Sequence, residues 1–195
     1  EMCIRDSIKK SLYENGVIME INAAPGIRMH HYPSAGKIRD VGEAILNLQY
    51  NGVPYNIPVI SITGTNGKTT TTRLISHVLK SMGYKVGMTS TEGTYIDGEC
   101  IETGDNSGYY SAKTVLLNKD VEVAVLETAR GGMIRNGLAY DVADVAVITN
   151  ITEDHIGIDG IEDMEELSKV KALVGEAVKE DGYVVINADD EWSLK

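Results

Sequence analysis

A short glycine-bearing stretch, Gly64–Thr70 (GTNGKTT), carries the residue types that bind phosphate. The backbone N–H groups of such a loop and the start of a following helix can hold phosphate oxygens. Lys68 would reach the terminal phosphates of a nucleotide, and the Thr69 hydroxyl would face Mg²⁺. The loop is shorter than the general form, because two residues separate Gly64 from Gly67 where that form has about four. An ordinary glycine turn is the alternative.

The segments on either side of this loop favour phosphate binding over a plain turn. Residues 58–63 (PVISIT) are mostly apolar and bounded by proline and glycine, which is typical of a buried strand. Residues 70–82 place their apolar side chains on one helical face. These side chains are Leu74, Ile75, Val78, Leu79 and Met82. A strand, a glycine loop and a helix in this order predict an ATP-dependent activity.

Two further polar clusters follow apolar runs. Glu127 ends the run at residues 121–127, where a nucleotide-hydrolysing enzyme places a carboxylate to hold Mg²⁺ or orient water. A simple strand cap is the alternative. Asn150, Asp154 and His155 follow the next apolar run. We expect His155 to be a metal ligand or a catalytic residue, oriented by Asp154.

Lys171 and a glutamate–asparagine pair are candidates that also have ordinary structural explanations. Lys171 lies on a predicted amphipathic helix, where an apolar environment would lower its pKa and make it reactive. A surface lysine is the alternative, and spacing does not choose between Lys171 and Lys169. Glu20 and Asn22 project from one side of a predicted strand and could bind a hard cation. Spacing alone favours two polar residues on a solvent-exposed face.

Predicted strands alternate with helices along most of the chain. We expect strands at residues 16–22, 58–63, 84–91, 121–127, 144–150 and 183–187, a hairpin at 94–101, and helices at 38–50, 70–82, 109–117 and 163–179. Residues 27–37 should form a loop. The order predicts an α/β fold with a doubly wound, mostly parallel sheet and a P-loop, in which ligands bind beyond the carboxyl ends of the strands. Residues 51–58 (NGVPYNIP) hold two prolines and are the expected domain boundary, giving domains at 1–57 and 58–195.

The composition excludes several classes of function. The chain has 195 residues, a net charge of −11 and a pI near 4.8, which argues against a nucleic-acid-binding surface. Cys3 and Cys100 are too few cysteines for a disulfide framework. No apolar stretch approaches the ~20 residues that cross a membrane, and no signal peptide opens the sequence. The cytoplasm is therefore the expected compartment.

Taken together, the motifs resemble those of the Mur ligase family, which forms amide bonds in cell-wall precursors and folylpolyglutamates. Gly64–Thr70 is similar to the shortened phosphate loop of that family. Its further motifs are matched in order by Glu127, Asn150, Asp154, His155, Lys171 and residues 187–190. Residues 20–30 (EINAAPGIRMH) and 127–135 (ETARGGMIR) resemble more specifically the cyanophycin synthetases, in which an ATP-grasp domain precedes a Mur-ligase-like domain. The resemblance covers roughly residues 12–195.

This resemblance implies roles for both parts of the chain. Residues 1–57 would be the tail of the ATP-grasp domain with a linker, and 58–195 the Mur-ligase-like central domain. The implied nucleotide-binding residues are Gly64, Thr65, Asn66, Gly67, Lys68, Thr69, Thr70, Asn150 and Asn187. The implied Mg²⁺ ligands are Thr69, Glu127 and His155 in the Mur-like site, with Glu20 and Asn22 in the ATP-grasp site. The implied catalytic residues are Lys68, His155 and Lys171. Of these, Lys171 matches a lysine that Mur ligases often carry as a carbamate.

The implied activity is ATP-dependent ligation with Mg²⁺. A substrate carboxylate would attack the γ-phosphate of ATP, and an amine would displace the resulting acyl phosphate. Arginine or aspartate would supply the amine, an Asp/Arg polypeptide would be the acceptor, and the full-length enzyme would be a homo-oligomer. Most of the ATP-grasp domain and the C-terminal Mur domain would lie outside these residues, so we expect nucleotide binding but little ligation from this chain alone. The alternatives are another Mur-type ligase, acting on a muropeptide or a folylpolyglutamate, and a nucleotide-binding module without ligase activity.

Overall fold

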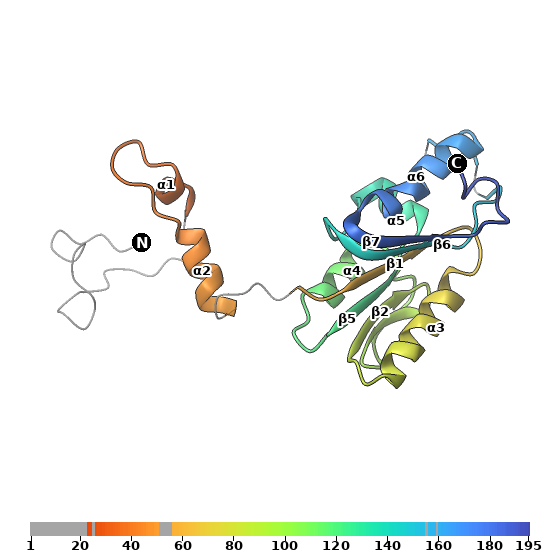
Figure 1. The fold of residues 1–195 in the computed structure, drawn as a ribbon, viewed down its shortest axis with the longest axis horizontal. Coiled ribbons are helices and arrows are strands. Elements are labelled where there is room, and N and C mark those ends of the chain that lie inside the picture. The colour runs from red at the N-terminus through yellow and green to blue at the C-terminus, as the bar shows by residue number, and fades with distance from the viewer. Residues whose placement is uncertain (1–22, 25, 51–55, 155, 159) are drawn as a thin grey trace. The chain divides into compact units, whose positions relative to one another are not determined.

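The structure is a computed structural model that describes residues 23, 24, 26–50, 56–154, 156–158 and 160–195 (Figure 1). Contacts within the chain divide it into two units, residues 1–55 and 56–195, and each is described by itself. The strand predicted at 16–22 lies outside the described residues. No helix in the described ranges is long and apolar enough to cross a membrane.

Among the described residues of the first unit there are two helices, α1 (Arg28–His31) and α2 (Val41–Tyr50). The loop predicted at 27–37 is wrong over α1, because a single helical turn is too short to show a periodicity. Helix α2 begins three residues later than predicted. The cause is Asp40, whose Oδ1 accepts a hydrogen bond from the Glu43 N–H at 2.8 Å and so caps the helix.

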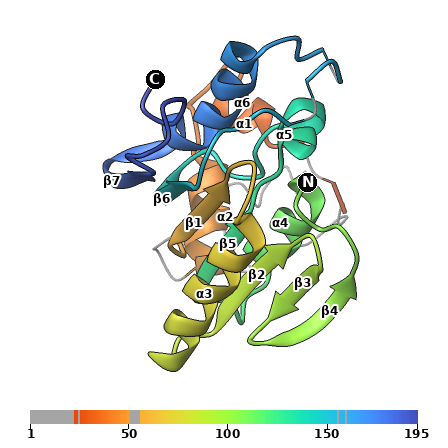
Figure 2. The ribbon, with the colours of Figure 1, turned by 90° about the vertical axis from the view of Figure 1, so that its right-hand side faces the viewer.

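The second unit is built on a seven-stranded sheet in the order β4-β3-β2-β5-β1-β6-β7, which can be followed in Figure 2. The strands are β1 (Val59–Thr63), β2 (Val86–Ser90), β3 (Gly93–Ile96), β4 (Glu99–Thr103), β5 (Val123–Glu127), β6 (Ala143–Ile148) and β7 (Val178–Ile186). Strands β2, β5, β1, β6 and β7 are parallel, while β3 and β4 add an antiparallel hairpin. Asp97 and Gly98 turn this hairpin at positive φ. The predicted α/β fold with a mostly parallel sheet is confirmed.

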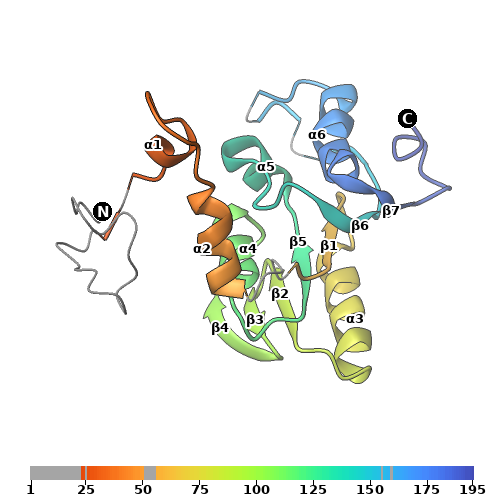
Figure 3. The same ribbon diagram turned by 60° about the vertical axis from the view of Figure 1, so that its left-hand side comes forward.

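Helices cover both faces of the sheet, as parallel strands that bury both faces require. The helices are α3 (Lys68–Ser81), α4 (Tyr109–Leu116), α5 (Arg130–Asn136) and α6 (Met164–Glu176). Helix α3 packs Ile75 and Leu79 onto one face, against Ile62 and its neighbours. Helices α4, α5 and α6 pack on the other face, where Val115 and Val174 are fully buried. Figure 3 shows the sheet between α3 and α4.

Two helices differ from their predicted extents. Helix α3 begins two residues early, at Lys68, directly after Gly67. Of its predicted apolar face only Ile75 and Leu79 pack in the core, while Leu74, Val78 and Met82 are 62%, 49% and 66% exposed. Helix α6 ends at Glu176 rather than at residue 179, because β7 already begins at Val178, where it pairs with Ala143 of β6.

Helix α5 has no counterpart among the predicted elements. Gly131 and Gly132 lie inside it, and glycine disfavours a helix by about 1 kcal/mol relative to alanine. The fold needs glycine at position 132, because a Cβ there would lie 3.0 Å from the Gly108 Cα and 3.3 Å from the Ser107 carbonyl oxygen. The missing side chain lets the first turn of α5 lie against the start of α4.

Gly87 of β2 is predicted to be essential for packing between the sheet and α4. A Cβ at this position would lie 2.4 Å from Val115 Cγ1 and 2.9 Å from Val121 Cγ2, and both valines are buried and stiff. Gly87→Ala should lower the free energy of unfolding by about 1–3 kcal/mol in urea titrations. Gly175→Ala is the matched control, because its Cβ would lie 3.5 Å from Val184 Cγ1, and it should be neutral or slightly stabilising. Equal unfolding midpoints for the two variants would contradict this packing.

Candidate functional site

The phosphate loop joins β1 to α3 and lies against the segment that follows β6. Gly64 has a φ of 144°, and a Cβ there would lie 2.0 Å from Thr149 Oγ1 and 3.1 Å from the Asn150 carbonyl oxygen. Gly67 has a φ of 83° and precedes the first turn of α3. A side chain at Gly64 would collide with the neighbouring loop, and positive φ strains other residues at both positions. Gly64 therefore permits the close approach of the two loops, and Gly67 permits the left-handed turn that starts α3.

Hydrogen bonds join the phosphate loop to the same segment after β6. The Thr65 N–H donates to the Asn150 carbonyl at 2.8 Å, and the Thr149 hydroxyl donates to the Asn66 carbonyl at 2.7 Å. The Asn150 side chain accepts from the Asn66 N–H and donates to the Asn66 carbonyl, both at 3.0 Å. Asn150 thus acts on the backbone of the loop, and its contact with a nucleotide stays a prediction.

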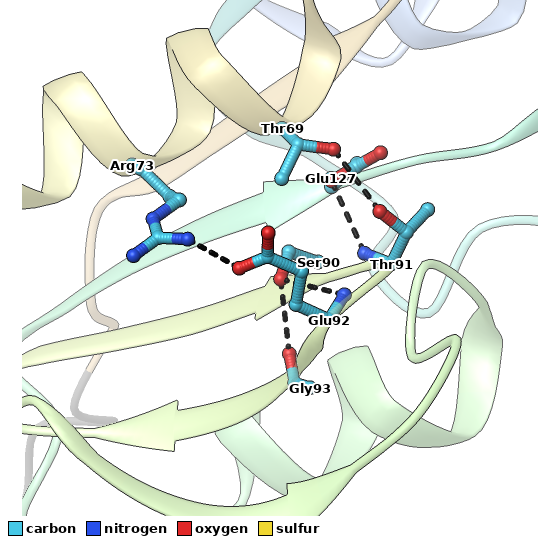
Figure 4. Close-up of polar contacts among 7 residues, drawn as sticks. All are labelled: Thr69, Arg73, Ser90, Thr91, Glu92, Gly93 and Glu127. Carbon is cyan, nitrogen blue, oxygen red and sulfur yellow. Dashed lines mark hydrogen bonds and ion pairs between the residues drawn. The ribbon is translucent and has the colours of Figure 1, made fainter.

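Glu127 lies at the carboxyl end of β5, near Thr69 and Thr91 (Figure 4). It is 2% exposed; its Oε2 accepts from the Thr91 N–H at 3.3 Å, and its Oε1 has no hydrogen-bond partner among the described residues. Burial raises the pKa of the Glu127 carboxyl, while the Thr69 side chain, the Thr91 N–H and the charge of Lys68 act in the opposite direction. A buried carboxylate oxygen without a donor, next to a threonine hydroxyl, fits the hard oxygen ligands that Mg²⁺ prefers.

An ion pair fixes the turn between β2 and β3 beside these residues. Arg73 of α3 pairs with Glu92. The Glu92 N–H donates to the Ser90 hydroxyl at 3.2 Å, and that hydroxyl donates to the Gly93 carbonyl at 3.4 Å (Figure 4). These contacts connect helix α3 to the turn that carries Thr91.

A chain of hydroxyl groups connects the end of β5 to β1 on the other face of the sheet. The Tyr140 hydroxyl donates to Ser61 Oγ at 2.6 Å, and Ser61 Oγ lies 2.9 Å from Thr128 Oγ1. Burial raises the pKa of Tyr140, so its hydroxyl remains protonated and keeps this donor role. Because Thr128 follows Glu127 directly, the chain helps to hold the backbone that carries the buried carboxylate.

Lys171 of α6 is 4% exposed, which is unusual for a lysine. Burial, followed by the charge of Lys68, lowers the pKa of Lys171 to about 8, whereas Asp154 acts in the opposite direction and Arg130 adds to the lowering. Lys169, the alternative on the same helix, is exposed. Of the two lysines, Lys171 is therefore the buried one, and Lys169 is the surface lysine.

Lys68 and Lys171 line the same cavity, which has a volume of about 460 Å³. The first turns of α4 and α5 line it too. Its cationic side chains are Lys68, Arg130, Arg135 and Lys171, and its acidic side chains among the described residues are Asp105 and Asp154. Cations thus outnumber carboxylates in the described lining, although the whole chain carries a net charge of −11. The cavity is suited to an anionic ligand.

Asn187 does not line the cavity, and three other predicted site residues are not described by the structure. Asn187 follows β7, its side chain accepts from the Asp189 N–H at 3.0 Å, and it is not among the residues that line the cavity. Glu20, Asn22 and His155 lie outside the described residues, so their metal-binding roles stay predictions. No group of three or more His, Cys, Asp or Glu side chains suited to a metal occurs in the part of the chain that the structure describes.

Sequence reasoning missed the two arginines and the turn before α4. Arg130 and Arg135 follow shortly after the strand-end carboxylate of Glu127, and this position is the signal that could have pointed to them. Asp105 accepts from the Ser107 hydroxyl at 2.6 Å and so shapes the turn that begins α4. It lies in a glycine-rich stretch whose pattern gives no comparable signal.

Lys171 should make stability depend on pH in a defined direction. Below about pH 8 the folded chain carries a buried charge at Lys171; above it, the folded chain has lost that proton while the unfolded chain keeps it up to about pH 10.4. The unfolded state then binds more protons, so stability rises with pH. From about pH 7.5 to about pH 10, in EDTA, the wild type should gain about 1–3 kcal/mol relative to Lys171→Met in urea unfolding.

Lys169→Met is the matched control for this measurement. Lys169 is exposed and pairs with Glu165 at 2.7 Å, and this partner raises its pKa, so the variant should run parallel to the wild type over the same pH range. Parallel curves for Lys171→Met and the wild type would show that Lys171 keeps its ordinary titration.

Comparison with known proteins identifies the family. The model of the Mur ligase middle domain matches residues 62–195. The cyanophycin synthetase of Synechocystis sp. is 50% identical over 189 residues, which is 96% of this chain and 22% of that protein. The chain thus spans about a fifth of the length of this relative.

Solved structures agree with this match. A UDP-N-acetylmuramoyl-L-alanyl-D-glutamate–2,6-diaminopimelate ligase superposes with a TM-score of 0.57 at 25% identity, over 77% of this chain and 30% of that chain. A bifunctional folylpolyglutamate synthase/dihydrofolate synthase with Mn, AMPPNP and L-glutamate bound gives 0.53 at 26% identity, over 70% and 39%. The chain therefore belongs to the Mur ligase family, of which it carries the middle domain.

Proposed function

We propose that this chain supplies the ATP-binding and carboxylate-activating site of an ATP-dependent acid–amino-acid ligase. The observation that carries the proposal is the cavity beside the phosphate loop, which places Lys68, Lys171 and two arginines around one anion-sized space. The similarity to a cyanophycin synthetase supports arginine as the amine and an Asp/Arg polypeptide as the acceptor. The domain boundary near residue 57 belongs to the same proposal.

The reaction has two steps. An oxygen of the acceptor carboxylate attacks the γ-phosphorus of ATP, the bond to the bridging β–γ oxygen breaks, and ADP leaves. The neutral amine then attacks the acyl carbon, the bond to the phosphate oxygen breaks, and inorganic phosphate and a proton are released. Lys68 would stabilise negative charge on the transferred group, and the cavity would hold the acceptor carboxylate in line with it.

Thr69 and Glu127 would hold Mg²⁺, and His155 is the third ligand that the family resemblance implies. The bound cation would neutralise phosphate charge. In this chain the Glu127 carboxylate is held by the Thr91 N–H through one oxygen, which leaves Oε1 for a cation.

Lys171 would contact either the acceptor carboxylate or a metal ion, depending on whether its amine is modified. With a pKa near 8, a fraction of its amines is neutral at neutral pH, and only the neutral amine can form the carbamate that the family resemblance implies. Such a carbamate would convert a buried cation into an anionic metal ligand. The unmodified cation would instead attract the acceptor carboxylate.

Glu127→Gln should remove the metal dependence of nucleotide binding. The amide keeps the size of the side chain but lacks the charge that attracts a cation. In calorimetric titrations of this chain, Mg²⁺ should tighten ATP binding in the wild type, and Glu127→Gln should lose most of that gain while its metal-free affinity stays unchanged. Glu122→Gln is the control, because Glu122 is exposed and its carboxylate accepts from the Lys85 N–H away from the loop. An unchanged Mg²⁺ effect in Glu127→Gln would exclude Glu127 as a ligand.

The proposed activity is tested by ADP formation in the full-length protein. With ATP, Mg²⁺ and an Asp–Arg primer that ends in aspartate, addition of arginine should produce ADP. Lys68→Ala should lower this arginine-dependent ADP formation at least about tenfold, because a charge-assisted contact to phosphate is lost. ADP formation that depends on aspartate should persist in Lys68→Ala if the ATP-grasp site adds that residue.

Lys80→Ala serves as the control at the other end of α3, where Lys80 pairs with Asp97 at 3.6 Å. If ADP forms only with a muropeptide or a folate acceptor, the protein is another Mur-type ligase and the proposed substrates are wrong. Tight, Lys68-dependent ATP binding with no ADP from any acceptor would indicate a nucleotide-binding module.

A further inference from the structure

The guanidinium of Arg135 is folded back along α5 toward the start of that helix. A Cβ at Gly131 would lie 3.5 Å from Arg135 Nη2 and 3.8 Å from its Cζ, so the guanidinium lies over the first turn. Arg135 and this turn both line the cavity. Arg135 thereby reaches the end of α5 that faces the phosphate loop.

Arg130 brings a second guanidinium to the same part of the cavity. Its Nη1 donates to the Ile158 carbonyl at 3.1 Å, which orients the side chain. One cavity is lined by Lys68 and Lys171 (the lysine end) and by Arg130 and Arg135 (the arginine end). A ligand in this cavity that carries two negative groups can thus meet both ends.

The two ends differ in the chemistry that they recognise. A lysine ammonium is a compact point charge suited to a phosphate oxygen or to the oxygen that attacks it. A guanidinium is planar and pairs with both oxygens of a carboxylate. A carboxylate that is being converted to an acyl phosphate cannot stay in such a pair through both oxygens. The arginine end therefore suits a carboxylate that does not react.

We propose that Arg135, together with Arg130, binds the unreacted carboxylate of an acceptor whose terminal residue carries two carboxylates. This inference rests on the proposed function, in which the acceptor ends in aspartate. Only two carbon atoms separate the carboxyl groups of aspartate, so an acceptor held by the arginines through one carboxylate would keep the other inside the same cavity, which Lys68 also lines. The arginines would then decide which carboxylate is activated, and Arg135 is a specificity-determining residue.

A pair of matched acceptors tests this assignment in the full-length protein. One primer ends in aspartate with a free α-carboxylate, and the other ends in the same residue with an α-carboxamide. For arginine-dependent ADP formation, the wild type should show a KM for the free acid at least about tenfold lower than for the amide. Arg135→Ala should raise the KM for the free acid at least about tenfold and leave the KM values for the amide, arginine and ATP within about twofold.

Arg135→Lys keeps the charge but not the planar fork, and should recover only part of the preference for the free acid. Lys119→Ala removes one positive charge beyond the other end of α4 and should change none of these constants. Equal losses for both primers, or no preference in the wild type, would overturn the carboxylate assignment. A raised KM for arginine instead would assign Arg135 to the incoming amino acid. If the wild type forms no arginine-dependent ADP with either primer, the proposed function fails, and this inference fails with it.

Discussion

The close contact between the phosphate loop and residues 149–152 is the constraint on which the site depends. Gly64 approaches Thr149 and Asn150 so closely that no side chain fits between them, and hydrogen bonds between the two loops occupy the backbone groups on that side. The loop is thereby fixed by β6 as well as by the strand and helix that it joins. Because β1 lies between β5 and β6, this contact also sets where the loop stands relative to the carboxylate at the end of β5.

Burial of charge gives the site its second property. Glu127 and Lys171 are both almost inaccessible to water. Burial raises the pKa of Glu127 and lowers the pKa of Lys171, so it favours the neutral form of each. A cation next to Glu127 and an anion next to Lys171 would each favour the charged form again. The charged forms of Glu127 and Lys171 are therefore destabilised by burial. A bound metal nucleotide would stabilise the charged form of Glu127, and a bound carboxylate would stabilise that of Lys171. The acidic surface of the chain adds a field that disfavours anions elsewhere, so the anionic ligand depends on this local cluster.

Sequence patterns predicted the sheet well because its strands are short apolar runs that end in polar residues. They also named Lys68 and Thr69 from the glycine loop that follows β1, and Glu127 from the end of β5. They failed where tertiary contacts override local preference. Helix α5 contains two glycines, and only its packing against Gly108 explains why one of them is needed. Arg135 lies over Gly131, its neighbour four residues earlier on α5, so its direction could be read from the sequence only if α5 had been predicted as a helix.

The contact between Gly132 and Gly108 has a mechanical consequence. With backbone against backbone, no rotatable side chain lies between the starts of α4 and α5 to absorb a displacement of either helix. The two turns that line the cavity therefore cannot approach each other more closely unless backbone atoms shift. Because α4 also packs against β2 and β3, a push of α5 toward α4 would bear on this edge of the sheet rather than be absorbed by a side chain.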